Sequence, residues 1–124
     1  MGQVSAKLRR AEGAFMWWCP ACNEMHPLPD GWTFNGDVNA PTFSPSFKHE
    51  GAQIEKDASG NWTGRWLTET GEAKTVFAST DKPKRYCCHY IVAAGRVAYC
   101  GDCTHAMAGR TIAMPDLPRE FRDL

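Results

Sequence analysis

The sequence predicts a mostly β fold, arranged as a single small domain of antiparallel hairpins over residues 1–124. Short runs of β-forming residues, separated by Gly, Pro, Asn and Asp, recur along the chain, and no window shows a long amphipathic helical pattern. A chain of 124 residues fits one domain that buries roughly two thirds of its extended-chain surface. Its mean hydropathy of -0.45 predicts a thin core, which leaves room for a stabilising metal ion.

The first expected element is an N-terminal hairpin. Residues 6–10 and 14–18 flank the turn signal Glu12-Gly13, and the second strand runs directly into Cys19-Pro20-Ala21-Cys22. Zinc ribbons begin with a Cys-x-x-Cys knuckle at a hairpin end, so we expect a zinc-ribbon-like knuckle here. Later strands are expected at residues 32–35, 42–49, 52–56, 61–68, 74–79, 88–93 and 96–100.

The middle of the chain differs from both ends. Residues 48–85 contain no cysteine and are rich in charged residues and glycines, which predicts a solvated β-meander inserted between two cysteine clusters. Near the C-terminus, residues 104–108 followed by Gly109 predict one short helical turn that stops at the glycine. Pro115 and Pro118 oppose regular structure beyond it.

Charge and hydrophobicity argue against several classes of protein. The 14 Lys and Arg residues balance 14 Asp and Glu residues, which disfavours a protein that binds nucleic acid through surplus positive charge. No apolar run approaches the roughly 20 residues of a membrane helix, and no secretory signal follows the N-terminal basic residues. We therefore expect a cytoplasmic protein of the host cell cytosol that has no membrane partner.

The six cysteines carry the sharpest signal in the sequence. In a reducing compartment, thiols at two-residue spacing bind metal more often than they form disulfides. Four thiolates would close the coordination of Zn²⁺, which makes a structural ion the expected role. The arrangement is Cys19-x-x-Cys22, then Cys87-Cys88-His89, then Cys100-x-x-Cys103-x-His105.

A hairpin about Ala94-Gly95 sorts the C-terminal candidates by strand alternation. It would place His89 opposite Cys100, and it would put Cys88 and His89 on opposite faces. Two ligand sets remain open on this geometry. One is Cys19, Cys22, Cys88 and Cys103, and the other, which the spacing favours, is Cys19, Cys22, Cys100 and Cys103.

Three histidines and one aspartate lie near these cysteines in the sequence. If one ion gathers the cysteine segments, these side chains come into its neighbourhood. They could complete a mixed site, ligate a second ion or form hydrogen bonds to the ligands. The four residues are His26, His89, His105 and Asp102.

Four motifs stand out in the first and last thirds of the chain. They are Cys19-Pro20-x-Cys22-x-x-x-His26, Trp32-x-x-Asn35-Gly36-Asp37-x-x-x-Pro41-Thr42-Phe43-Ser44-Pro45-Ser46, Cys88-His89, and Gly101-Asp102-Cys103-Thr104-His105-x-x-Ala108-Gly109. Together they resemble a family of small phage and prophage proteins of unknown function, often labelled ammonia monooxygenase. The label has no chemical support, because a copper monooxygenase of that name is a membrane enzyme.

The resemblance reverses the choice of ligands that spacing alone favours. It implies that the segment at residues 48–85 is variable. It also implies a zinc set of Cys19, Cys22, Cys88 and Cys103, with His26, His89 and His105 as alternates. The spacing keeps Cys100 as a further alternate.

The loop motif around Asn35-Gly36-Asp37 permits two interpretations. It could be an ordinary turn between strands. Alternatively, it could present a polar and aromatic surface beside the metal loops, to which a partner or a small ligand binds. The second interpretation predicts a binding surface formed by Trp32, Asn35, Asp37, Thr42 and Ser44.

Three functions fit these observations. The favoured one is a zinc-stabilised phage or prophage protein that binds a host or phage protein, for instance to inhibit a defence protein, because no phosphate loop or nucleophile elbow is present. A nucleic-acid-binding zinc ribbon ranks last, since the net charge is zero. The alternative is a small zinc-dependent hydrolase that uses His26, His89 or His105 with Asp102 or Asp37 as general acid or base.

Overall fold

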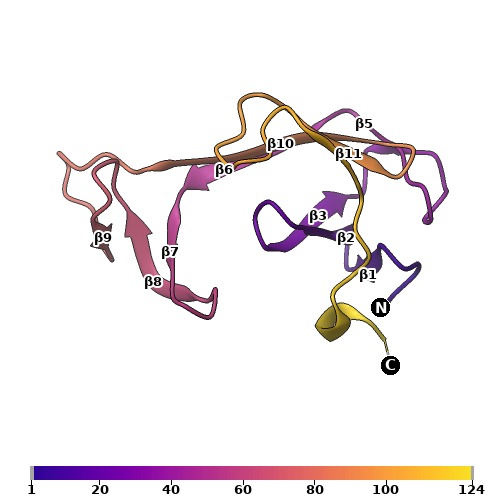
Figure 1. The fold of residues 1–124 in the computed structure, drawn as a ribbon, viewed down its shortest axis with the longest axis horizontal. Coiled ribbons are helices and arrows are strands. Elements are labelled where there is room, and N and C mark those ends of the chain that lie inside the picture. The colour runs from indigo at the N-terminus through magenta and orange to yellow at the C-terminus, as the bar shows by residue number, and fades with distance from the viewer. Residues whose placement is uncertain (1, 124) are drawn as a thin grey trace. The chain divides into compact units, whose positions relative to one another are not determined.

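The computed structural model describes residues 2–123, which fold into two compact units. The first unit contains the chain up to Lys48 and again from Cys88, and the second contains His49–Cys87. As predicted, the described residues are mostly β, with antiparallel sheets and one short 3-10 turn near the C-terminus (Figure 1). None of their helices is long and apolar enough to span a membrane. That residues 48–85 are a variable insertion stays a prediction.

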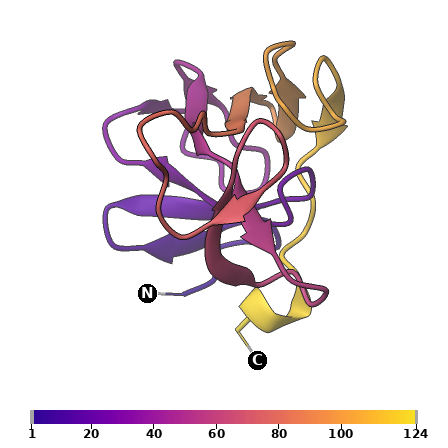
Figure 2. The ribbon, with the colours of Figure 1, turned by 90° about the vertical axis from the view of Figure 1, so that its left-hand side faces the viewer.

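A three-stranded antiparallel sheet in the order β1-β2-β3 begins the first unit (Figures 1 and 2). Its register confirms the predicted hairpin about Glu12-Gly13, where Gly13 adopts the positive φ of 73° that the turn requires. Strand β3 was not expected, because Pro27 and Pro29 oppose a strand. It lies at the edge of its sheet, where a proline need not donate a hydrogen bond to a neighbour. The bounds are β1 Arg9–Ala11, β2 Ala14–Cys19 and β3 Glu24–Pro29.

The second sheet has the order β12-β11-β10-β6. Its central hairpin pairs Tyr90 with Tyr99 and Val92 with Val97, which confirms the register predicted about Ala94-Gly95. Strands β6 and β10 are the two strands along which the chain passes from one unit into the other. The bounds are β6 Phe47–Ala52, β10 Arg85–Ala93, β11 Arg96–Tyr99 and β12 Thr111–Ala113.

Between β3 and β6 the chain forms a short two-stranded ribbon. Its strands are β4 Thr33–Phe34 and β5 Phe43–Ser44. Phe34 and Phe43 are paired across it, and their rings stack with centroids 4.6 Å apart. Stacked aromatic rings bury much apolar area at a small cost in side-chain entropy. The ribbon therefore holds the segment that follows β5 in a defined place.

The core of the first unit is centred on Trp17 and Tyr90, which are both fully buried. The indole Nε1 of Trp17 donates a hydrogen bond of 2.9 Å to the Tyr90 hydroxyl, so these two buried polar groups satisfy each other. Apolar side chains from the N-terminal sheet, the central hairpin and the C-terminal segment complete this core. They include Leu8, Leu28, Val92, Val97, Met114 and Leu117.

The helical turn near the C-terminus lies later than residues 104–108. Residues 104–108 form isolated turns instead, because the backbone that follows them forms hydrogen bonds to β11. Gly109 N donates to Tyr99 O at 3.0 Å, and Tyr99 N donates to Arg110 O at 2.8 Å. The 3-10 turn η1 occupies Arg119–Phe121. Pro118 precedes it with φ of -56°, a value that is already suited to the start of a helical turn.

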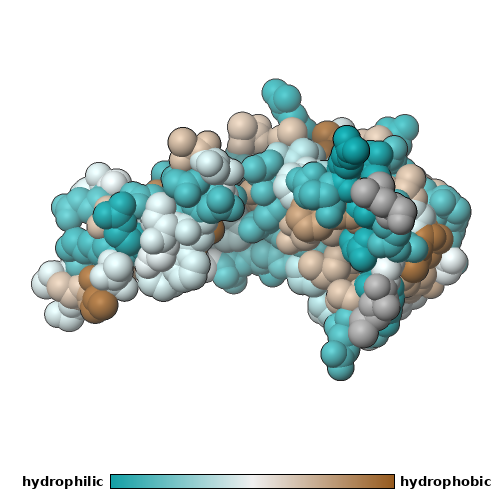
Figure 3. Space-filling model, turned by 90° about the horizontal axis from the view of Figure 1, so that it is seen from below, coloured by the Kyte–Doolittle hydropathy of each residue, from teal (hydrophilic) through white to brown (hydrophobic). Residues whose placement is uncertain are grey.

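The second unit contains a sheet in the order β7-β8-β9. Polar contacts support it, such as Arg65 to Glu55 at 2.6 Å and Lys74 to Asp81 at 2.9 Å. On the face seen in Figure 3, hydrophilic side chains predominate and hydrophobic ones form separate patches. The bounds are β7 Ile54–Lys56, β8 Trp62–Leu67 and β9 Ala73–Lys74.

Candidate functional site

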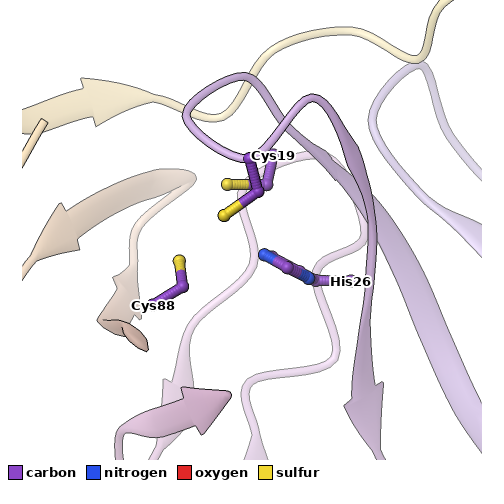
Figure 4. A group of neighbouring side chains, drawn as sticks. Cys19, His26 and Cys88 are labelled. Atoms are coloured by element: carbon purple, nitrogen blue, oxygen red, sulfur yellow. The ribbon is translucent and has the colours of Figure 1, made fainter. Parts of the chain in front are cut away.

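One group of buried sulfur and nitrogen donors lies in the first unit. Cys19 ends β2, Cys22 lies in the following turn, His26 lies on β3 and Cys88 lies on β10. Each side chain offers a ligand atom, and these atoms all lie within 4.8 Å of one another. Figure 4 shows Cys19, His26 and Cys88 directed toward a common centre. These four side chains, here named the buried cluster, could hold a metal ion.

Local sequence explains how the N-terminal part of this cluster forms. Alternation along β2 turns Trp17 and Cys19 to the same, buried face. The chain then reverses at Asn23, which adopts a left-handed φ of 55°, a conformation that asparagine tolerates better than most residues. The returning strand β3 consequently carries His26 back toward Cys19.

The thiols of the buried cluster influence the ionisation of one another. Hydrogen bonds from Cys22 and Cys88 hold the pKa of Cys19 far below its usual value, despite burial. Hydrogen bonds to Cys19 and Cys22, together with burial, raise the pKa of Cys88 far above its usual value. Ionisation of one thiol of the cluster therefore opposes ionisation of its neighbour. A divalent ion would compensate this repulsion, and three thiols with an imidazole suit a soft or borderline ion.

A second donor group shares Cys88 with the buried cluster. His105 Nε2 lies 3.4 Å from Cys88 Sγ, and burial lowers the pKa of His105. Cys103 Sγ donates to the backbone oxygen of His89 at 3.1 Å and accepts from its N–H at 3.3 Å. Cys88, Cys103 and His105 therefore also form a group that could hold a metal ion. Of the predicted zinc ligands, Cys19, Cys22 and Cys88 come together, with His26 as the fourth member and Cys103 in the neighbouring group.

A third arrangement combines a hydroxyl, an imidazole and a carboxylate. His89 Nε2 lies 3.1 Å from Ser46 Oγ, while His89 Nδ1 lies 3.1 and 3.2 Å from the two carboxylate oxygens of Asp102. Partial burial raises the pKa of Asp102, but the hydrogen bond and charge of His89, together with Lys48, hold it below its usual value. Lys48 Nζ lies 3.7 Å from Asp102. The connectivity of hydroxyl, imidazole and carboxylate is that of a serine hydrolase triad.

The fold brings these three residues together through neighbours of the thiol groups. His89 follows Cys88 on β10, so alternation points the two side chains to opposite faces. Asp102 immediately precedes Cys103. Ser46 immediately precedes β6, and its backbone oxygen accepts a hydrogen bond of 3.3 Å from Trp32 Nε1.

Ser46 was not a candidate residue in the sequence analysis. The sequence lacks the nucleophile elbow that would mark a catalytic serine, and Ser46 is far from His89 and Asp102 along the chain. The only local signal was its place at the end of the Pro41-Thr42-Phe43-Ser44-Pro45-Ser46 motif. Only the folded structure, which places its hydroxyl beside His89, identifies Ser46 as a candidate.

The predicted binding surface makes extensive contacts within its own unit. Asn35 Oδ1 accepts hydrogen bonds of 3.1 Å from the backbone N–H groups of Asp37 and Thr42. Thr42 Oγ1 accepts one of 2.7 Å from Ala94 N, and Trp32 stacks on a phenylalanine of β6. These contacts support the loop itself. Binding of a ligand by Trp32, Asn35, Asp37, Thr42 and Ser44 stays a prediction.

Comparison with known proteins gives one family. A family model described as "Bacterial ubiquitination-like system serine protease (BubE)" matches residues 2–100. The match includes Ser46 and His89, and Asp102 lies just beyond it. No curated protein and no solved structure matches the chain. The family description differs from the ammonia monooxygenase label, and a phage origin stays a prediction.

Proposed function

The chain belongs to the bacterial ubiquitination-like system serine protease (BubE) family, and from this premise we propose that it is a serine protease with Ser46 as its nucleophile. The observation that carries the proposal is the continuous hydrogen-bonded path from Ser46 Oγ through both ring nitrogens of His89 to Asp102. The distances, 3.1 Å on either side of the ring, are within hydrogen-bond reach.

Each member of the path has a defined role in acyl transfer. His89 Nε2 removes the proton of Ser46 as Oγ attacks the substrate carbonyl, and the same nitrogen then protonates the leaving amine. Water repeats the sequence to release the acyl group and regenerate Ser46. Asp102 accepts a hydrogen bond from Nδ1–H, which selects the tautomer with a basic Nε2 and stabilises the imidazolium that forms.

A metal ion has a structural role in this proposal. The buried cluster supplies thiol and imidazole donors that fit Zn²⁺, which would cross-link β2, β3 and β10 when bound. Cys88 adjoins His89, so an ion at Cys88 would also fix the strand that carries the catalytic base. Such an ion acts as a scaffold while the three side chains of the path perform the chemistry.

The proposal changes the order of the functions predicted from the sequence. It shares His89 and Asp102 with the zinc-hydrolase alternative but assigns the nucleophile to Ser46 instead of a metal-bound water. The family description names a ubiquitination-like system, so a protein of such a system is the proposed substrate class. Binding to inhibit a host or phage protein stays a prediction.

The direct test is covalent labelling of the full-length, metal-loaded chain with a fluorescent fluorophosphonate, which reacts with activated serines. We expect one label on Ser46 by intact mass and peptide mapping, and none in Ser46→Ala. The matched control is Ser79→Ala, which removes an exposed hydroxyl of the second unit and should leave labelling unchanged. A folded, metal-loaded wild-type chain that takes no label at Ser46 would refute the proposal.

A further inference from the structure

Cys100 lies against the path of Ser46, His89 and Asp102 but has no role in it. His89, Cys100 and Asp102 each offer a ligand atom, and these three atoms lie within 4.8 Å of one another. The backbone explains the proximity, because Cys100 N donates a hydrogen bond of 2.8 Å to His89 O. The Cys100 side chain is half-buried, so an ion from solvent has access to it.

The three side chains offer a thiol, an imidazole and a carboxylate, which are the three common zinc ligand types. Three protein ligands leave one coordination position for water, as in exchangeable zinc sites. We propose that His89, Cys100 and Asp102 form a second, reversible site for a thiophilic divalent cation such as Zn²⁺ or Cd²⁺. Occupancy of this site switches the protease off, a consequence that rests on the proposed function of Ser46.

Inhibition follows from the chemistry of the imidazole. A cation at Nδ1 displaces the proton that His89 donates to Asp102, so the remaining ring proton of a neutral histidine resides on Nε2. A protonated Nε2 cannot accept the proton of Ser46. A cation at Nε2 occupies the base directly. A cation that binds Nδ1 and Asp102 together also removes the hydrogen bond between them.

This second site is chemically distinct from the buried cluster. The buried cluster has four donors, three of them thiols, whereas the second site has one thiol and a carboxylate. Lys48 Nζ lies 3.7 Å from Asp102 and opposes an incoming cation there. We therefore expect the buried cluster to fill first and the second site to fill at higher ion concentration.

The test is a Cd²⁺ titration of the full-length chain, with two readouts. Thiolate-to-cadmium charge-transfer absorbance reports binding, and the rate of fluorophosphonate labelling at Ser46 reports the state of the triad. The first equivalent, added to the metal-free chain, should fill the buried cluster, complete folding and give the reference labelling rate. The second should add a smaller absorbance step and slow labelling by roughly 10⁴-fold at full occupancy, the scale of a triad held in the wrong tautomer.

Cys100→Ser separates the two sites. It should keep the first absorbance step and the labelling rate, and it should lose both the second step and the inhibition. His49→Gln, which removes a histidine of the second unit, should behave as wild type and controls for unspecific binding to imidazole.

Three results would overturn the inference: no second step in wild type, a second step that persists in Cys100→Ser, or a second step that leaves labelling unchanged. A chain that is never labelled at Ser46 would refute the proposed function and the inhibition together. The absorbance titration would still decide whether the second metal site exists.

Discussion

The two units of this protein use different means to hold their side chains in place. The first unit has a buried core around Trp17 and Tyr90, and all three groups of metal-type donors found among the described residues belong to it. The second unit contains half-buried ion pairs such as Lys74 with Asp81. The candidate metal-binding groups of this protein therefore lie in the unit whose packed core fixes both strand register and turn geometry.

Within the first unit, one strand supplies both kinds of chemistry. Cys88 is fully buried and belongs to the buried cluster, while its neighbour His89 contacts Ser46 and Asp102 on the other face. Because successive side chains of a strand point to opposite faces, two adjacent residues can take part in two different sites. The proposed metal ligand and the proposed catalytic base therefore lie on adjacent residues but on opposite faces of β10.

The largest expected effect comes from Cys88→Ser, which removes a donor shared by two of the groups. Binding of a structural zinc ion is worth about 10–16 kcal/mol in small zinc domains. That is comparable to the total stability of an ordinary domain, about 5–15 kcal/mol. We expect the first unit to lose its metal and unfold, as measured by elemental analysis and by loss of dispersed amide NMR signals. Unchanged metal content and melting temperature would show that Cys88 is not a ligand, and Cys100→Ser is the control.

The second prediction breaks the triad without touching the core. Asp102→Asn removes the acceptor that selects the His89 tautomer, so kcat/KM and the labelling rate of Ser46 should fall by about 10⁴-fold. Occupancy of the buried cluster and the melting temperature should stay at wild-type values, because Asp102 is exposed and is not a donor of that cluster. Asp116→Asn, at an exposed ion pair with Lys7, is the matched control and should retain full activity. A wild-type labelling rate in Asp102→Asn would remove this residue from the mechanism.

The fold was largely predictable because its signals are local. Alternation and a two-residue turn suffice to set Tyr90 against Tyr99, and the structure confirms this register. Strand β3 was missed because its prolines oppose a strand, and only its edge position makes them acceptable.

The candidate site was less predictable because its members come from distant segments. The Cys19-x-x-Cys22 spacing is a short-range signal that points to metal chemistry without any knowledge of the fold. Ser46 carries no such spacing, since a hydroxyl acquires a catalytic role only from the groups that surround it. His89 and Asp102 were assigned to metal chemistry for the same reason: their cysteine neighbours are adjacent in sequence, whereas Ser46 is adjacent only in space.

A pair of facing tyrosines tests how far the metal scaffold and the core are independent. The hydroxyl of Tyr99 lies 3.1 Å from Cys19 Sγ, so Tyr99→Phe should weaken metal binding by about 10- to 100-fold, as loss of a hydrogen bond to a ligand does. Competition with a chromophoric chelator would measure this change. An unchanged affinity would show that the tyrosine does not support the thiolate.

Tyr90→Phe is the counterpart from the opposite strand. It leaves the buried Trp17 N–H without its 2.9 Å acceptor and should lower the free energy of unfolding by about 1–3 kcal/mol. Metal affinity should change much less than in Tyr99→Phe. Equal effects of the two variants on chelator competition would mean that core and metal site respond as one unit.

The smallest expected effect is in the second unit, where Lys74 Nζ donates hydrogen bonds of 2.9 Å to both carboxylate oxygens of Asp81. Hydrogen bonds from Lys74 and from Ala78 N hold the pKa of Asp81 below its usual value. The ionised Asp81 therefore contributes stability above its unfolded pKa of about 3.9, and this contribution is lost as the pH falls through the lower folded pKa. The pKa of Lys74 is raised by the same hydrogen bond, so its contribution is lost only as the pH rises through that higher value.

Between these limits the contribution of the pair to the stability of the second unit should be independent of pH. Asp81→Asn should make the second unit less stable near neutral pH and flatten its acid transition, followed by tryptophan fluorescence because Trp62 and Trp66 both lie in this unit. Glu69→Gln, a neighbouring exposed carboxylate, should retain the wild-type transition.

Because the pair is partly exposed, added salt should reduce the difference between Asp81→Asn and wild type. An acid transition identical in Asp81→Asn and wild type would show that turns and strand pairing, and not this ion pair, hold the second unit together.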